Sequence, residues 1–505
     1  ESPAYNNRGI SLRKLGNSRQ AVESFKKATE LSPGFANAFM NRGNSLGDLG
    51  DFQGAMESYV QALTIEPNSP IAISNLLFTL SFVKPNEKEE NLKIAKRFGE
   101  AVSSLVPSTF EHPNIASRER LRVGFVSGDL RNHPVGYFLE SFLSEIDRES
   151  IEFFAYPTTH NEDELSERIK SNFTKWSPVQ EFRSNFLIEH QETAAKMIHD
   201  DGIDVLFDLS GHTNLNGLPI FAWKPAPVQV TWAGYFATTG VKEMDFILGD
   251  SHVIPEGEED HFTEKVWRLP NHYFCFSSPG TNIEVDELPA TASGCVTFGC
   301  FNSLIKMNDE VVETWSELLK AVPESKLFLK TKILKSEEEK EKVRNRFSDW
   351  GVDAEQLILE GASPRAELLA AYNRVDIALD PFPYPGGATS AEALWMGVPV
   401  LTLRGNDFLS RVGESVVSNA GYREWIATDR QDYVAKGVEF ASDLTGLAET
   451  RRFLRQRVLE SPLFDGKRFA KDFQAAVRGM WAEQLDLLRS NTSLKKKADS
   501  KGKSI

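Results

Sequence analysis

Two glycines followed by two hydroxyl residues form the segment best suited to hold an anion. The stretch DPFPYPGGATS, residues 380–390, lies between a run typical of a buried strand and one typical of a helix, and its prolines can continue neither. Gly386 and Gly387 allow the backbone to approach a ligand. Thr389 and Ser390 stand where the helix begins, and free N–H groups there favour a diphosphate. The alternative is an ordinary turn with a Thr/Ser helix cap.

Charged residues follow other strand-like runs. Lys306 lies shortly after the apolar run CVTFGCF, and Arg365 follows the run QLILEG. A lysine aimed into a cleft can neutralise a diphosphate leaving group, although a solvated surface lysine is the other interpretation. Glu392, near the first turn of the helix above, is placed to accept hydrogen bonds from ribose hydroxyls.

Histidines are the candidates for handling an acceptor proton. His133 directly follows the run LRVGFVS, and a histidine at a strand end can act as a general base or orient a hydroxyl. A structural histidine bonded to loop carbonyls is equally consistent with this position. His199 ends a helical pattern before a strand, which is typical of a helix C-terminus.

These residues require parallel sheets to bring them together. From residue 121, short apolar runs alternate with helical patterns, and the same alternation starts again near residue 295 after a loop-rich stretch. It predicts two parallel sheets with helices on both faces. Since ligands bind beyond the carboxyl ends of such strands, we expect a cleft between two lobes that contains the residues above.

The N-terminal part repeats with a period of 34 residues. Residues 2–35 align with 36–69, and a third first helix begins at residue 71. Period, small residues and closing prolines resemble tetratricopeptide repeats, which stack into a superhelix with a concave binding face. Asn7, Asn41 and Asn75 occupy equal positions and could bind a peptide backbone, or only cap and solvate their helices.

Composition excludes several classes of function. The formal net charge of −15 argues against nucleic-acid or anionic-membrane binding. The sequence has no long apolar run and no signal-peptide pattern, so we expect a cytoplasmic protein without a membrane partner. The 3 cysteines do not suit a disulfide framework or a zinc site. No Asp-x-Asp motif is present to bridge a diphosphate through a metal.

Four segments carry a resemblance to a known family. LRVGFVSGDLRNHP, PAPVQVTWAGY, CFNSLIKM and DIALDPFPYPGGATSAEALWMGVPVLTL resemble the protein O-GlcNAc transferases, including the plant SPINDLY-type branch. In that family, tetratricopeptide repeats precede a metal-independent glycosyltransferase of the GT-B fold. The resemblance implies a multidomain α + α/β chain, with a repeat superhelix followed by two Rossmann-like lobes.

The expected divisions follow from the patterns and the resemblance together. They are the repeats (1–82), a linker helix and loop (83–120), an acceptor-side lobe (121–275), an interlobe connection (276–294), a donor-side lobe (295–490) and a disordered basic tail (491–505).

The resemblance also implies roles for individual residues. His133 and His199 match active-site histidines, and Lys306 matches the lysine that binds the donor diphosphate. The expected donor contacts are Ser303, Lys306, Ser363, Arg365, Gly387, Ala388, Thr389, Ser390 and Glu392. The repeat residues Asn7, Asn41 and Asn75 match asparagines that grip acceptor peptides.

Several positions depart from the animal enzymes. Ser303 stands in place of Gln, Gly387 in place of His, Glu392 in place of Asp, and Leu368 in place of a His beside the nucleotide base. The stretch PFPYPGGATSAEALWMG, residues 381–397, is closer to the SPINDLY-type pattern, whose plant members transfer fucose from GDP-fucose.

The leading expectation is therefore an inverting transferase that moves GlcNAc from UDP-GlcNAc to Ser/Thr hydroxyls of polypeptides bound by the repeats, with no cofactor and no metal. The closest alternative is the same chemistry with GDP-fucose. An inactive repeat scaffold and a nucleotide-sugar epimerase are further alternatives, although the repeats favour a polypeptide substrate.

Overall fold

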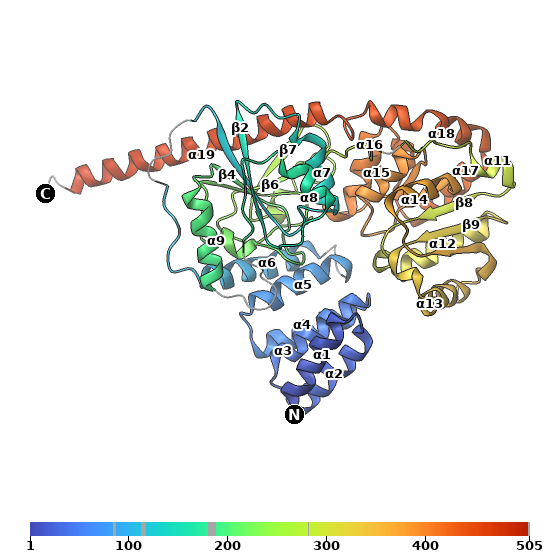
Figure 1. Cartoon of the computed structure of the whole chain (residues 1–505), viewed down its shortest axis with the longest axis horizontal. Helices are drawn as coiled ribbons and strands as arrows, with labels where there is room; N and C mark the ends of the chain where they lie inside the picture. The colour runs from blue at the N-terminus through green and yellow to red at the C-terminus, as the bar shows by residue number, and fades with distance from the viewer. Residues whose placement is uncertain (84–86, 113–117, 180–187, 281, 503–505) are drawn as a thin grey trace.

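The protein is an N-terminal helical arm followed by two sheet-based lobes that lie next to one another (Figure 1). The computed structural model describes residues 1–83, 87–112, 118–179, 188–280 and 282–502. The last helix runs back from the second lobe across the first, so the C-terminus lies far from the second lobe (Figure 1).

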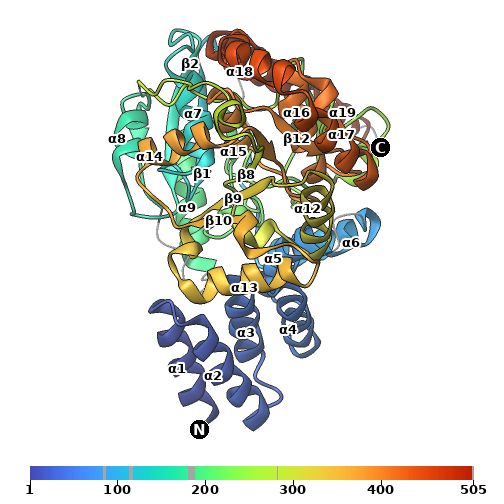
Figure 2. The same ribbon diagram turned by 90° about the vertical axis from the view of Figure 1, so that its right-hand side faces the viewer.

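The arm consists of antiparallel helix pairs, as the 34-residue period predicted, and α1 to α4 lie below the two lobes in the side view (Figure 2). Its helices are α1 (Ser2–Lys14), α2 (Ser18–Leu31), α3 (Ala36–Asp48), α4 (Phe52–Ile65), α5 (Pro70–Val83) and α6 (Lys88–Ser103). Gly9 and Gly43 stand at equal positions of the two repeats, and a Cβ atom at each would lie 2.6 Å from the ring of Phe25 and of Tyr59, respectively. The small residues are therefore needed where each repeat's helices cross.

Helices α5 and α6 belong to the core of the first lobe as well as to the arm. Leu77 and Phe98 lie in one buried cluster with Trp223 of the lobe. The backbones also touch, because a Cβ atom at Gly99 would lie 1.8 Å from the carbonyl oxygen of Gly240. Gly240 has φ of 74°, in the left-handed region that favours glycine. This contact fixes α6 against the lobe.

We expect Gly99→Ala to lower the melting temperature, because the added methyl group cannot fit without moving α6 from Gly240. Overpacking of this kind costs about 1–3 kcal/mol. The matched control is Gly47→Ala in α3, where a Cβ atom would meet nothing within 4 Å. There the change should stabilise by about 0.5–1 kcal/mol. Equal melting shifts for the two variants in scanning calorimetry would contradict the close contact.

The first lobe is built on a seven-stranded sheet whose strands are all parallel, in the order β3-β2-β1-β4-β5-β6-β7. The strands are β1 (Leu121–Ser127), β2 (Ile151–Pro157), β3 (Lys175–Trp176), β4 (Val205–Asp208), β5 (Val228–Thr231), β6 (Phe246–Asp250) and β7 (Lys265–Leu269). The helices are α7 (Pro134–Leu143), α8 (Glu164–Lys170), α9 (Ile188–Asp200), α10 (Leu218–Phe221) and the short η1 (Glu259–His261). The strand order reverses between β1 and β4.

The second lobe is a six-stranded parallel sheet in the order β10-β9-β8-β11-β12-β13. The strands are β8 (Thr297–Cys300), β9 (Lys326–Lys330), β10 (Leu357–Glu360), β11 (Ile377–Leu379), β12 (Val400–Leu403) and β13 (Ile426–Ala427). The α-helices are α11 (Pro289–Ser293), α12 (Asp309–Ala321), α13 (Glu337–Ser348), α14 (Arg365–Ala370), α15 (Ala388–Trp395), α16 (Val412–Asn419), α17 (Arg430–Ser442) and α18 (Leu444–Leu459). The short 3₁₀ turns are η2 (Leu304–Lys306), η3 (Lys332–Lys335), η4 (Ala354–Gln356), η5 (Ala371–Arg374), η6 (Leu409–Arg411) and η7 (Arg423–Trp425). This order reverses between β8 and β11, so the fold is the expected pair of Rossmann-like lobes.

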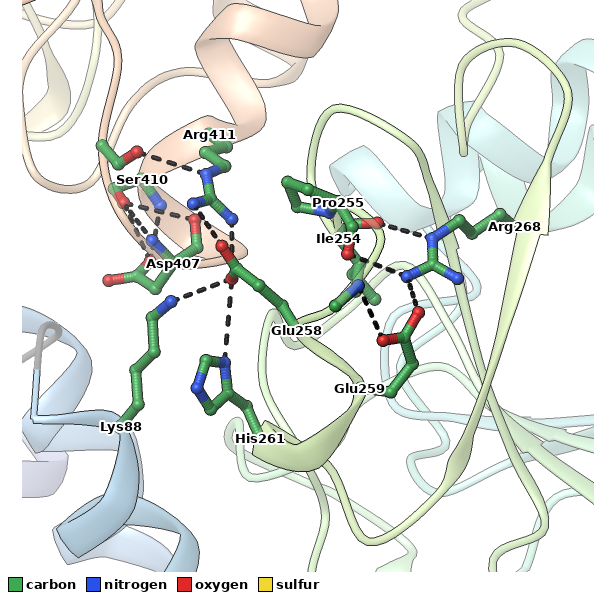
Figure 3. A network of polar contacts seen from close by, with 12 residues as sticks. Lys88, Ile254, Pro255, Glu258, Glu259, His261, Arg268, Asp407, Ser410 and Arg411 are labelled. Atoms are coloured by element: carbon green, nitrogen blue, oxygen red, sulfur yellow. Dashed lines mark hydrogen bonds and ion pairs between the residues drawn. The ribbon is translucent and has the colours of Figure 1, made fainter.

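The carboxylate of Glu258 joins the arm and both lobes (Figure 3). It accepts hydrogen bonds from Arg411 of the second lobe at 2.7 and 2.9 Å and from Lys88 of α6 at 2.9 Å. His261 lies 3.7 Å away in the first lobe. The hydrogen bonds from Arg411, together with Lys88, hold the pKa of Glu258 at about 2. The carboxylate therefore stays ionised, and it ties three parts of the chain at one point.

The C-terminal helix α19 (Gly466–Gly502) packs on the first lobe rather than on the second. Lys265 of β7 pairs with Glu483, and Asn271 donates to Asp472 at 3.0 Å. The helix continues to Gly502, whereas the segment 491–505 was expected to be disordered. The sequence SLKKKADSK contains good helix formers and no proline, which explains the extension. Within the described ranges, no helix is long and apolar enough to cross a lipid bilayer.

Candidate active site between the lobes

A cavity of about 400 Å³ lies between the two lobes. Its walls are the segments that follow β1, β4, β5 and β7 in the first lobe and β8, β11 and β12 in the second, together with Phe78 of α5. The points at which the two strand orders reverse therefore face one space, as expected for ligand sites in open α/β sheets. Four of the predicted residues line it, namely His133, Lys306, Gly387 and Ala388.

Lys306 reaches the cavity from the 3₁₀ turn after β8. Its Nζ donates to the carbonyl oxygen of Pro385 at 2.7 Å and to Oδ1 of Asn302 at 3.3 Å, and it lies 4.3 Å from the ring centroid of Tyr384. Burial lowers the pKa of Lys306 to about 8, and the neighbouring Asp380 opposes this shift. The ammonium group is held by two neutral acceptors, so its charge remains available to an anion.

Asp380 holds the loop that contains Gly386 and Gly387 through hydrogen bonds to its carboxylate. Its carboxylate accepts hydrogen bonds from the backbone N–H of Gly386 at 2.6 Å and from the hydroxyls of Ser390 at 3.2 Å and Thr402 at 3.0 Å. Burial raises the pKa of Asp380 to about 6. Ser390, which was predicted to contact the donor, is buried and already uses its hydroxyl here. Its place in the structure is to support the loop.

Asn302 connects the lysine to the helix start. Its Oδ1 accepts hydrogen bonds from Lys306 and, at 2.8 Å, from the hydroxyl of Thr389 in the first turn of α15. Gly387 is the N-cap residue of α15 and provides no side-chain cap, which leaves N–H groups of the first turn to a ligand. Lysine, hydroxyl and helix start therefore form one unit.

Glu392, which was expected to accept hydrogen bonds from ribose hydroxyls, is paired with another side chain in the structure. It is buried and accepts a hydrogen bond from Arg365 at 2.7 Å. Burial raises the pKa of Glu392, and the Arg365 guanidinium opposes that shift. The same guanidinium lies 4.3 Å from the ring of Tyr137 in the first lobe. Arg365 therefore links α15 to the opposite lobe.

Two polar atoms beside this ion pair are buried without a hydrogen-bond partner among the described residues: Nη2 of Arg365 and Oγ of Ser363. Buried polar groups are normally paired, so unpaired ones indicate a missing ligand or water. Both residues were predicted to contact the donor. Their unused donors are consistent with that role.

His133 caps the helix that follows β1. Its Nδ1 accepts a hydrogen bond from the N–H of Val135 at 3.4 Å and lies 3.7 Å from Oδ2 of Asp129. Burial lowers the pKa of His133, and Asp129 opposes the shift. The imidazole is therefore neutral near pH 7, with the proton on Nε2 because Nδ1 acts as an acceptor.

His199 does not line the cavity. It ends α9, where its ring stacks on Phe110 with centroids 4.6 Å apart and lies 5.5 Å from His112. His199 is therefore not part of the cavity lining to which His133 belongs. Ser303 is exposed at the start of the turn that carries Lys306 and does not line the cavity either.

The repeat asparagines differ from one another. Asn41 donates to Asn6 at 3.0 Å, and Asn75 donates to Asn44 at 2.9 Å, so each bonds to an amide of the preceding repeat helix. Asn7 is exposed on α1. The three side chains therefore do not form one uniform row.

Sequence reasoning assigned no role to Asp380 and Tyr384, which shape the cavity. Both come shortly after the run that became β11, so the rule that selected His133 and Lys306 would also have selected them. In the described part of the chain, no group of three or more His, Cys, Asp or Glu side chains is arranged to hold a metal ion.

Comparisons with known proteins agree with this architecture. Residues 79–278 and 283–473 match glycosyl transferase family 41, and residues 2–35 and 36–69 match tetratricopeptide repeats. The chain therefore belongs to glycosyl transferase family 41.

Two curated plant relatives and one solved structure are similar to this chain. Probable UDP-N-acetylglucosamine–peptide N-acetylglucosaminyltransferases SPINDLY are 31% identical over 414 residues in Solanum lycopersicum and 33% identical over 418 residues in Arabidopsis thaliana. These matches cover 82% and 81% of the chain but only 44% of each relative, so the chain spans less than half of their length. The structure of a mutant Thermobaculum terrenum O-GlcNAc transferase is 33% identical, with a TM-score of 0.87, over 97% of this chain and 92% of that one.

Proposed function

We propose that this chain is an inverting, metal-independent glycosyltransferase that moves GlcNAc from UDP-GlcNAc to Ser or Thr hydroxyls of polypeptides. Membership of family 41 and the names of its relatives support the reaction class and the donor. The observation that supports it most is that Lys306 and the start of α15 share one cavity with His133. The ammonium group that can stabilise a leaving diphosphate thus lines the same cavity as an imidazole that can hydrogen-bond to an acceptor hydroxyl.

In the proposed reaction, the acceptor oxygen attacks the anomeric carbon from the side opposite the diphosphate. As the new C–O bond forms, the bond to the diphosphate oxygen breaks, the nucleoside diphosphate leaves with the electron pair, and the hydroxyl proton passes to water or to an oxygen of the departing diphosphate. Lys306 and the N–H groups of α15 stabilise the charge that develops there. We expect this contribution to exceed that of a base, because the hydroxyl is a weak nucleophile.

His133 suits an orienting role better than that of a base. Since its Nδ1 accepts from Val135, the neutral imidazole carries its proton on Nε2. Such a nitrogen donates to the acceptor oxygen and holds it for attack, but it cannot take the hydroxyl proton. Proximity and alignment of this kind lower the barrier without a change in protonation.

The donor nucleotide is tested by calorimetric titration with UDP and, separately, GDP in buffer without divalent metal ions. Micromolar binding of UDP with weak binding of GDP supports a UDP-sugar donor. The reverse preference moves the proposal to transfer from GDP-fucose. Binding of neither nucleotide would overturn the enzyme proposal and favour a repeat scaffold.

Transfer itself is tested with a Ser-containing peptide and UDP-GlcNAc, followed by mass spectrometry. A mass increase of one N-acetylhexosamine on the peptide supports the proposal. Conversion of the sugar nucleotide without modified peptide would instead indicate an epimerase.

UDP affinity should fall as the pH rises above about 8. The pKa of Lys306 is lowered to about 8, so its ammonium group is charged below that pH and neutral above it. The dissociation constant should therefore rise only about twofold between pH 7 and 8 and by up to about tenfold per unit at higher pH, since one proton is lost from the binding group. Titration of Lys306→Met over the same range is the control, and this variant should lack the dependence. An identical pH slope in both proteins would contradict the assignment.

A further inference from the structure

The ring of Tyr384 forms a floor under the ammonium group of Lys306. The Nζ atom lies 4.3 Å from the ring centroid, within the range in which an aromatic face attracts a cation. Both residues line the cavity between the lobes. The Nζ atom is thus held by this ring, by the Pro385 carbonyl and by Asn302.

Tyr384 is itself held by residues from two other parts of the chain. The ring centroid of Phe82 in α5 lies 4.9 Å from that of Tyr384. The ring centroid of Phe236 in the first lobe lies 6.1 Å from it, with an angle of 86° between the ring planes. Phe82 also stacks on Phe52 of α4, with centroids 4.0 Å apart. We call Phe52, Phe82, Tyr384 and Phe236 the aromatic bridge, because they run from the second repeat to the lysine and on to the first lobe.

A second contact lies beside the bridge. A Cβ atom at Gly50, in the turn between α3 and α4, would lie 3.6 Å from Cγ2 of Ile305, the residue next to Lys306. The turn between the repeat helices therefore lies close to the turn that carries Lys306.

We propose that Tyr384 is a positioning residue for Lys306, and that the repeat helix α5 holds it in place through Phe82. A lysine side chain has several rotatable bonds and loses their freedom when its ammonium group is fixed. A ring face beneath Nζ restricts the lysine side chain before the diphosphate binds, so less conformational entropy is lost on binding. Unlike a carboxylate, the ring does not neutralise the ammonium group that the diphosphate needs. This inference rests on the proposed function, because it gives Lys306 the diphosphate as its ligand.

The test is a double-mutant cycle in the full chain. UDP affinity is measured by calorimetry in the wild-type protein, Tyr384→Leu, Lys306→Met and the double variant. If Tyr384 acts through Lys306, Tyr384→Leu should weaken binding about fivefold alone and less than about twofold in the Lys306→Met background. The same factor in both backgrounds would overturn the proposal, since it would show a general loss of structure.

Two further variants separate the ring from its hydroxyl and from nonspecific damage. Tyr384→Phe keeps the aromatic face and should bind UDP within about twofold of the wild type. Phe440→Leu removes a ring that stacks on Trp425 elsewhere in the second lobe, and it should leave UDP affinity unchanged. A fivefold loss in Tyr384→Phe would assign the effect to the hydroxyl and overturn the proposal.

The role of helix α5 in holding Tyr384 is tested with Phe82→Leu. It should weaken UDP binding about twofold to threefold, and this loss should disappear in the Tyr384→Leu background. Persistence of the loss there would show that α5 does not act through Tyr384.

The cycle is repeated with inorganic pyrophosphate, which needs the lysine but no nucleoside site. If the wild type binds neither UDP nor GDP, the proposed function fails. The pyrophosphate cycle still decides the inference, because equal factors in the two Lys306 backgrounds, or no pyrophosphate binding, would refute it.

Discussion

Lys306→Met should reduce turnover by at least about a hundredfold, because removal of one preorganised group that stabilises developing charge typically costs 10²–10³ in rate. Its ammonium group is held at the cavity by Pro385 and Asn302, and methionine keeps the length of the side chain without the charge. UDP affinity should fall as well. The measurement is peptide glycosylation under saturating donor, together with calorimetry.

Lys320→Met is the matched control for this prediction. Lys320 is exposed on α12 and does not line the cavity, so the same chemical change there should leave turnover within about twofold, as for most surface substitutions. Unchanged turnover in Lys306→Met with normal donor binding would refute the role of Lys306.

Gly386→Ala should weaken UDP binding by at least about tenfold, because its methyl group displaces the loop by more than the half ångström that such sites tolerate. A Cβ atom there would lie 2.3 Å from Oγ of Ser390, 2.6 Å from Oγ1 of Thr389 and 3.0 Å from Oδ1 of Asp380. The loop would have to give up the bonds that set the start of α15. Calorimetric titration with UDP measures the loss.

The neighbouring glycine offers a direct comparison. A Cβ atom at Gly387 would meet only Phe274, at 3.8 Å, which is an ordinary contact. Gly387→Ala should therefore lose much less affinity than Gly386→Ala, about threefold or less. If the two variants behave alike, steric fit of the loop does not determine binding.

The architecture was predictable because its signals are local. The 34-residue period in residues 2–69 and the apolar runs that became β1, β2, β4, β5 and β6 can be read from neighbouring residues. β3 has only two residues, and no apolar run could indicate it. Its strand character comes from pairing with β2, which sequence alone does not contain.

The site was predictable only in part. Strand ends indicated His133 and Lys306, since the fold brings the strand ends next to each reversal of order to one place. The pairing of Arg365 with Glu392 joins residues 27 positions apart in different helices, so no pattern could reveal it. His199 could equally have faced the cleft, and only packing on Phe110 places it elsewhere. The roles of these residues remain proposals.

The chain passes between the lobes twice, and the two crossings touch. The N–H of Phe276, where the chain leaves the first lobe, donates to the carbonyl oxygen of Leu463, just before α19 returns to it, at 2.8 Å. A cut after the exposed Gly280 would give one fragment with the repeats and first lobe, and another with the second lobe and α19. The second fragment would contain α19, which packs on the first lobe. The two fragments of a folded chain cut there should therefore stay associated through α19.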